Sequence, residues 1–130
     1  PDRRESIKFA LRHYGRVHIC YYIRSQNGKT INVSKDKNEP SISVDRTSWM
    51  DLSLGRFKNG TIYLPTDVTN EYKDHLKAPI RRYKKDAEGN PKGDYETGDG
   101  VADHYAHARN YAEIALRFII GSGVNQDIRE

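Results

Sequence analysis

The sequence contains few cysteines and few large apolar side chains. Among its 130 residues there are one cysteine, one methionine, one tryptophan and three phenylalanines. A single cysteine excludes an intramolecular disulfide, and Cys20, within the run VHICYYI, is most simply a buried small hydrophobic residue in a reducing compartment. No stretch approaches the length of a membrane span, and no signal peptide is recognisable. The chain starts at Pro1, without an initiating Met and already in helical-looking sequence, so we expect a piece of a longer protein.

Several sequence motifs that are typical of particular enzyme classes are also absent. There is no P-loop and no dinucleotide-binding glycine fingerprint. The His-Glu-x-x-His arrangement of zinc hydrolases does not occur, and the single cysteine lies far from the histidines of the C-terminal third. A serine or cysteine nucleophile with a histidine base is equally unsupported, since no nucleophile elbow is present.

What remains is a polar, tyrosine-rich chain of single-domain length. Apolar residues make up 35% and charged residues 31%, which is compatible with one folded core. The net charge of +4, from 22 basic and 18 acidic residues, permits a polyanionic partner without requiring one.

Helices and strands are expected to alternate, which predicts the α/β class. The first half predicts an amphipathic helix over 1–14, a central strand over 16–23, a hairpin turn at QNGK (26–29), short strands at 30–34 and 41–47, and a helix around 49–57 capped by Thr47 or Ser48. The second half predicts a strand at TIYLP (61–65), a helix from Thr66 that Pro79 kinks or ends, a β-ribbon over 81–97, and a last helix followed by a flexible tail over 122–130. The apolar stripes expected on the last two helices are Val68, Tyr72, Leu76, Ile80 and Tyr83, and then Val101, Tyr105, Ala108, Ala112, Ala115 and Ile119.

The start of the last helix, DGVADHYAHARNYAEIAL (99–116), is the first candidate site. Asp103 and His107 are four residues apart and share a helix face away from the predicted apolar stripe. One interpretation of Asp103 is structural, namely a carboxylate that interacts with the free N–H groups and the positive dipole end of the helix. The other is a metal-binding carboxylate flanked by glycines that let a substrate backbone approach.

A basic cluster, KAPIRRYKK (77–85), is the second candidate. It can be a solvated face, or it can contact phosphates, because it leads into the predicted ribbon. The residues that could contact phosphates are Arg81, Arg82, Lys84, Lys85 and, at the end of the strand SISVDRT, Arg46. The structural alternative for Arg46 is an ion pair with Asp45 or Asp51.

Taken in order, these segments resemble the C-terminal nuclease domain of the large terminase subunit of tailed bacteriophages. The resemblance rests on GRVHICYY, on VDRT with Asp51 four residues after Thr47, on TIYLP, on DHLK, on a glycine-tipped ribbon that ends in Tyr95, and on DHYAHARNYAEIA. It covers residues 1 to about 120, so we assign 1–121 to the C-terminal part of such a domain. It implies a ribonuclease H-like mixed sheet flanked by helices.

The resemblance also implies a function and a site. Proteins of this family use an acidic cluster that binds Mg²⁺ or Mn²⁺ to cut concatemeric double-stranded DNA during genome packaging. Two such ions about 4 Å apart activate a water and stabilise the leaving oxygen. Asp103 matches the third acidic ligand, and His104 matches a neighbouring position that tunes the site or contacts the scissile phosphate. The implied partners are duplex DNA, an ATPase domain, the small terminase subunit and the portal, and the implied location is the host cytoplasm.

The chain departs from the family because the regions for the first two carboxylates are absent. It is therefore expected to be an N-terminally truncated nuclease fragment that cuts little or nothing alone. Within the chain, Asp45, Asp51 and Asp99 are the remaining carboxylates that could join Asp103. Two other functions stay open, a non-catalytic DNA-binding module that uses the basic ribbon and an interaction module for another packaging component.

Overall fold

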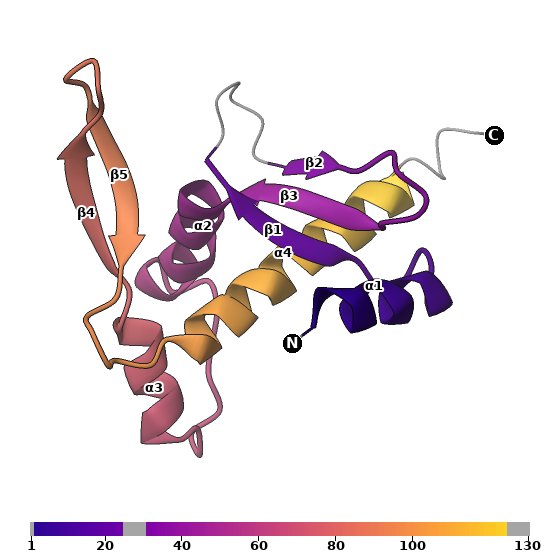
Figure 1. The fold of residues 1–130 in the computed structure, drawn as a ribbon. Coiled ribbons are helices and arrows are strands. Elements are labelled where there is room, and N and C mark those ends of the chain that lie inside the picture. The colour runs from indigo at the N-terminus through magenta and orange to yellow at the C-terminus, as the bar shows by residue number, and fades with distance from the viewer. Residues whose placement is uncertain (1, 25–30, 125–130) are drawn as a thin grey trace. The chain divides into compact units, whose positions relative to one another are not determined.

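The computed structural model describes residues 2–24 and 31–124, with side chains up to Phe118. The chain divides into two compact units, residues 1–48 and 49–130. Figure 1 labels the helices and strands of both. The described residues form four helices and two small sheets, so the predicted α/β class is confirmed at this level. The predicted turn at 26–29 and residues 125–130 of the predicted tail lie outside the described residues.

The first unit contains a three-stranded mixed sheet. Its elements are α1 (Arg3–Arg12), β1 (Ile19–Ile23), β2 (Ile31–Val33) and β3 (Ser41–Asp45). The strand order is β1-β3-β2, with β3 parallel to β1 and antiparallel to β2. The central strand is therefore β3, whereas the sequence pattern predicted the segment 16–23. Two apolar faces do not reveal which strand has hydrogen-bonded neighbours on both sides.

Local interactions define the ends of these elements. Asp2 caps α1, because its side chain accepts a hydrogen bond from the backbone N–H of Arg4. Asp45 ends β3 and accepts a hydrogen bond from the Ser48 N–H at 2.8 Å. The helix that follows begins at Arg46, so Asp45, not Thr47 or Ser48, holds its first turn. Cys20 is half-buried in β1, and burial raises its pKa to about 11.

The second unit contains the rest of α2 (Arg46–Lys58), then α3 (Asn70–Lys77), β4 (Ile80–Lys85), β5 (Pro91–Glu96) and α4 (His104–Val124). The antiparallel pair β4–β5 confirms the predicted ribbon, and Arg81 lies opposite Tyr95 in its register. α3 packs against α4. The large side chains buried in this unit include Trp49, Met50, Tyr95 and Ile114.

Two predicted elements differ from the structure. Residues 61–65 form no strand, and Tyr63 is exposed. α3 starts after Thr69, whose hydroxyl accepts a hydrogen bond from the Tyr72 N–H, and not at Thr66. It ends two residues before Pro79, so Ile80 and Tyr83 belong to β4 and not to its apolar stripe.

The buried face of α4 also differs from the predicted stripe. Among the side chains described up to Phe118, the buried ones are Ala106, Asn110, Glu113 and Ile114, whereas Val101, Tyr105, Ala108, Ala112 and Ala115 are exposed. The last residue of the predicted stripe, Ile119, lies outside the described side chains. Glu113 explains the difference, because its carboxylate accepts hydrogen bonds from Arg56 of α2 at 2.6 and 2.8 Å and from Arg109 at 2.7 Å. An ion-paired carboxylate can occupy an interior that an apolar periodicity would assign to alanine.

Candidate functional site

Asp103 lies directly before α4, as the sequence predicted. The loop 97–103 leads from β5 to this point and turns at Gly98–Val101, where Gly100 adopts a φ of 74°. The Thr97 hydroxyl closes the loop, because it donates a hydrogen bond to Oδ2 of Asp103 at 2.6 Å. The Asp103 carbonyl accepts the first bonds of α4, from the N–H groups of Ala106 and His107.

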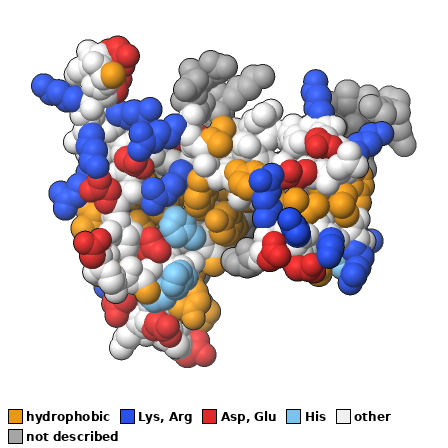
Figure 2. Space-filling view, viewed as in Figure 1, with side chains coloured by type: hydrophobic (Ala, Val, Ile, Leu, Met, Phe, Trp, Pro, Cys, Tyr) orange, Lys and Arg blue, Asp and Glu red, His pale blue; other side chains and the backbone are white. Residues whose placement is uncertain are grey.

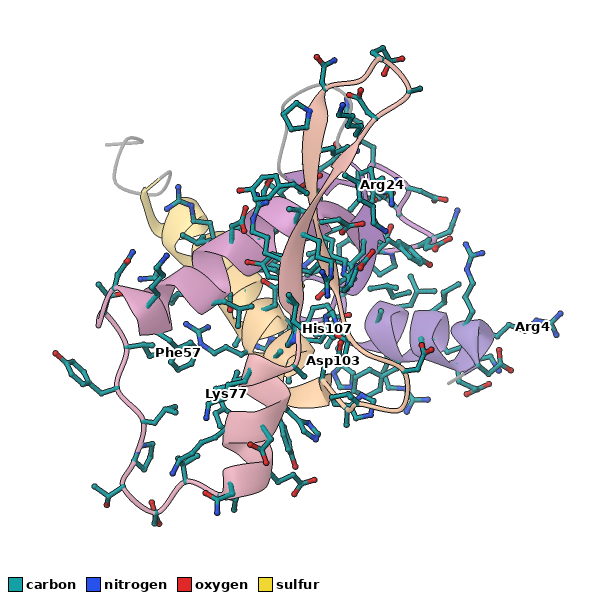
Figure 3. The ribbon with its side chains drawn as sticks, turned by 90° about the vertical axis from the view of Figure 1, so that its left-hand side faces the viewer. Arg4, Arg24, Phe57, Lys77, Asp103 and His107 are labelled. Carbon is teal, nitrogen blue, oxygen red and sulfur yellow. The ribbon has the colours of Figure 1, made fainter. Side chains whose placement is uncertain are left out.

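The Asp103 side chain faces Thr97 and His107. The Nε2 atom of His107 lies 3.3 Å from Oδ2, and the two side chains are each about one-fifth exposed (Figure 3). Burial alone would raise the pKa of Asp103, but the Thr97 hydrogen bond and the adjacent His107 ring outweigh burial and lower it. Asp103 is therefore a partly exposed carboxylate held in its ionised form. Its carboxylate hydrogen bonds go to these side chains, which is not the amide-capping arrangement of the structural interpretation.

His75 of α3 also contacts this end of α4, and it was not among the predicted site residues. Its Nδ1 accepts a hydrogen bond from the Tyr105 N–H at 3.4 Å, and its ring lies 4.7 Å from the Tyr105 ring. His104 is exposed, and its ring lies edge-on to His75 at 5.8 Å. The motif DHLK, in which His75 follows Asp74, was the only sequence signal for this contact.

Of the residues predicted to contact DNA, Arg81 has the most contacts within the protein. Its guanidinium donates two hydrogen bonds to the Asp51 carboxylate, at 2.7 and 2.8 Å, and lies 4.7 Å from the centre of the Tyr83 ring. Tyr95 donates a further hydrogen bond to Asp51 at 2.8 Å. These contacts join the ribbon to α2.

The other basic residues of the ribbon are more exposed but not all are free. Arg82 lies 3.5 Å from Glu96, and Lys84 also pairs with Glu96. Lys85 ends β4 and is exposed, and Arg46 is the half-buried first residue of α2. Basic and acidic side chains are interspersed along the ribbon surface (Figure 2).

A carboxylate held ionised and partly exposed is a suitable oxygen ligand for Mg²⁺ or Mn²⁺. Among residues 2–24 and 31–124, no group of three His, Cys, Asp or Glu side chains could hold a metal ion. The three carboxylates considered as recruits have other positions: Asp45 bonds the first turn of α2, Asp51 pairs with Arg81, and Asp99 is exposed in the loop. Asp103 therefore fits one ligand position of such an ion.

Comparison with known proteins identifies no relative, since no family model, curated protein or solved structure matches the chain. None of the helices in the described part of the chain is both long enough and apolar enough to cross a membrane.

Proposed function

We propose that this chain is the C-terminal part of a metal-dependent DNA endonuclease with a ribonuclease H-like fold, of the terminase large-subunit type. The observation that carries the proposal is the state of Asp103. It stands at the start of α4 where the family resemblance requires the third acidic ligand, and Thr97 and His107 keep it ionised. The parallel pair β1–β3 and the helices that follow are compatible with such a fold.

In this proposal Asp103 supplies one ligand to Mg²⁺ or Mn²⁺, and the remaining carboxylates belong to a preceding segment. Ions held there would supply activation of a water and stabilisation of the leaving 3′ oxygen of the DNA. In this proposal Asp103 binds the ion, and His104, which is exposed and next to it in the sequence, contacts the scissile phosphate. Duplex DNA is the proposed substrate, with phosphates contacted by exposed basic residues of the ribbon.

The test compares the 130-residue chain with an N-terminally extended protein on linear duplex DNA in Mg²⁺ or Mn²⁺. We expect the short chain to leave DNA intact, because it lacks the other carboxylates, and the extended protein to cut it. Asp103→Asn in the extended protein should reduce cutting to background, since it removes a negatively charged ligand.

The matched control is Asp99→Asn, which removes the same charge from an exposed position in the same loop. It should cut normally. Cutting that survives Asp103→Asn, or equal losses in both variants, would contradict the proposed role. Asp103-dependent cutting by the short chain would show that the whole site lies within these 130 residues.

A further inference from the structure

The two faces of the ribbon β4–β5 differ in charge. Side chains alternate between the faces along each strand, and residues opposite one another in the register share a face. One face carries both acidic residues of the two strands, and its members are Ile80, Arg82, Lys84, Lys92, Asp94 and Glu96. The other, which we call the tyrosine face, consists of Arg81, Tyr83, Lys85, Pro91, Gly93 and Tyr95. Within β4 and β5, the tyrosine face therefore has two cations and no carboxylate.

Side-chain contacts agree with this division. Glu96 pairs with Arg82 and Lys84 on the acidic face. On the tyrosine face, the Arg81 guanidinium occupies the space where a side chain at Gly93 would lie. The remaining acidic residues of the ribbon belong to its tip and are Asp86 and Glu88.

Tyr83 is an exposed aromatic ring that is held from one side. The residue is 71% exposed, and the Arg81 guanidinium lies 4.7 Å from the ring centre. Arg81 is itself held by two hydrogen bonds to the Asp51 carboxylate. Gly93, opposite Tyr83 in the register, has no side chain to cover the ring. The ring is thus positioned before a ligand arrives, and a positioned contact group loses less entropy on binding.

We propose that the tyrosine face binds an unpaired stretch of nucleic acid, with a base stacked on Tyr83 and a neighbouring phosphate at Lys85. Lys85 is exposed two residues further along β4, about 7 Å away by strand geometry. An aromatic ring beside a cation suits any single strand, because every base has a stacking surface and every nucleotide has a phosphate. In a duplex the neighbouring bases cover these surfaces, so the ring can stack only on an unpaired or terminal base. The inference needs no metal and does not depend on the role of Asp103.

The charge of this face favours nucleic acid over a protein partner. A surface with cations and no carboxylate attracts a polyanion. A protein partner that covered Tyr83 would need only apolar contact with the ring, whereas a nucleic acid needs both the ring and the cation. The experiments separate these two requirements.

The first experiment uses the unmodified 130-residue chain. It compares the affinity for a short oligothymidylate with that for an abasic strand of the same length, which keeps the phosphates and lacks the bases. We expect the oligothymidylate to bind about fivefold more tightly or better, and its addition to move the NMR signals of the Tyr83 ring protons upfield. Equal affinities, no binding of oligothymidylate, or an unchanged Tyr83 ring spectrum would overturn the proposal.

The second experiment changes the ring. Tyr83→Ala and Tyr83→Leu should each weaken oligothymidylate binding about fivefold or more, and Tyr83→Phe, which keeps the ring, should bind like the wild type. Tyr63→Ala is the control at an exposed tyrosine outside the ribbon, and it should bind normally. Full affinity of Tyr83→Leu would mean that apolar bulk is enough, as for a protein partner, and would contradict stacking.

The third experiment tests the phosphate contact. Lys85→Gln should reduce the magnitude of the slope of log affinity against log salt by about 0.7, the value for one phosphate contact on a single strand. Lys92→Gln removes the same charge from an exposed position on the acidic face and should leave the slope near that of the wild type. Equal slopes for the two variants would show that Lys85 contacts no phosphate and that the proposed arrangement is wrong.

Discussion

The Arg81 guanidinium can occupy its observed position only because Gly93 has no side chain. A Cβ atom at residue 93 would overlap the Arg81 guanidinium while that group is paired with Asp51. The backbone of Gly93 has no positive φ, so the requirement comes from space and not from backbone conformation. The glycine thus allows a bidentate ion pair that joins β4 to α2.

Gly93→Ala should therefore destabilise the protein. The added methyl group should displace Arg81 and so remove its charge-assisted hydrogen bonds to Asp51. Each such bond contributes at most about 1.5–3 kcal/mol. We therefore expect the free energy of unfolding to fall by about 1–3 kcal/mol. Urea denaturation measures it, and in an Arg81→Ala background the same substitution should cost little.

Gly55→Ala is the control, because Gly55 lies in α2 with open space around its Cβ position. It should stabilise the helix by about 0.5–1 kcal/mol. Equal effects of the two alanines, or an unchanged cost of Gly93→Ala without Arg81, would show that Arg81 is not what the glycine accommodates.

At the scale of elements, α4 shows what an apolar periodicity cannot predict. The helix and the position of Asp103 at its start were predicted correctly, because helix starts depend on local residues. Its buried face was predicted incorrectly, because the face is determined by Arg56, which is 57 positions from Glu113 in the sequence. A contact of that separation leaves no trace in a short sequence pattern.

The same reasoning applies to the strands and to the site. The ribbon β4–β5 was predictable from alternation around a glycine-containing tip, whereas residues 61–65 have a strand-like sequence but no strand partner among the described residues. Strand propensity is realised only when a partner is available.

In the site, Asp103 and His107 were predicted from their spacing. Thr97 and His75 were missed, because closure of the loop 97–103 and the packing of α3 on α4 bring them to the start of α4.

The Glu113 cluster should control acid stability. The Glu113 side chain is 4% exposed; burial raises its pKa, but the hydrogen bonds from Arg56 and Arg109 outweigh burial and lower it below the ordinary value. A lowered native pKa means that the stabilisation is complete above the ordinary glutamate pKa and is lost as pH falls through the lower native value.

Glu113→Gln should cost about 1–3 kcal/mol near neutral pH, because it removes charge-assisted hydrogen bonds to Arg56 and Arg109. Water screens part of the loss, since the Arg56 side chain is 37% exposed. The difference from wild type, measured by urea denaturation, should shrink progressively below about pH 4. Glu71→Gln, at an exposed position in α3, should show neither effect. A Glu113→Gln penalty that is constant from pH 7 to pH 3 would contradict an ionised, paired Glu113.

At the scale of the whole molecule, the net charge of +4 hides a local balance. The ribbon from Ile80 to Glu96 contains five basic and four acidic residues. Glu96 alone pairs with both Arg82 and Lys84, which are two of the predicted phosphate contacts. The ribbon can therefore contribute fewer phosphate contacts than its number of basic residues suggests, unless DNA competes with Glu96 for them.

Glu96→Gln should accordingly strengthen binding to duplex DNA of any sequence. Each additional phosphate contact adds about 0.9 to the magnitude of the slope of log affinity against log salt. Releasing Arg82 and Lys84 should steepen that slope, and replacing both with glutamine should flatten it below the wild-type value.

The matched control is Glu88→Gln at the tip of the same ribbon. It removes the same charge, so it changes the long-range electrostatic field by a similar amount. The measurement is a salt titration of the 130-residue chain with a fluorescent duplex. A steeper slope for Glu96→Gln than for Glu88→Gln would support phosphate contacts by Arg82 and Lys84. Equal slopes would mean that these two residues form a solvated, internally paired face and that DNA is bound elsewhere.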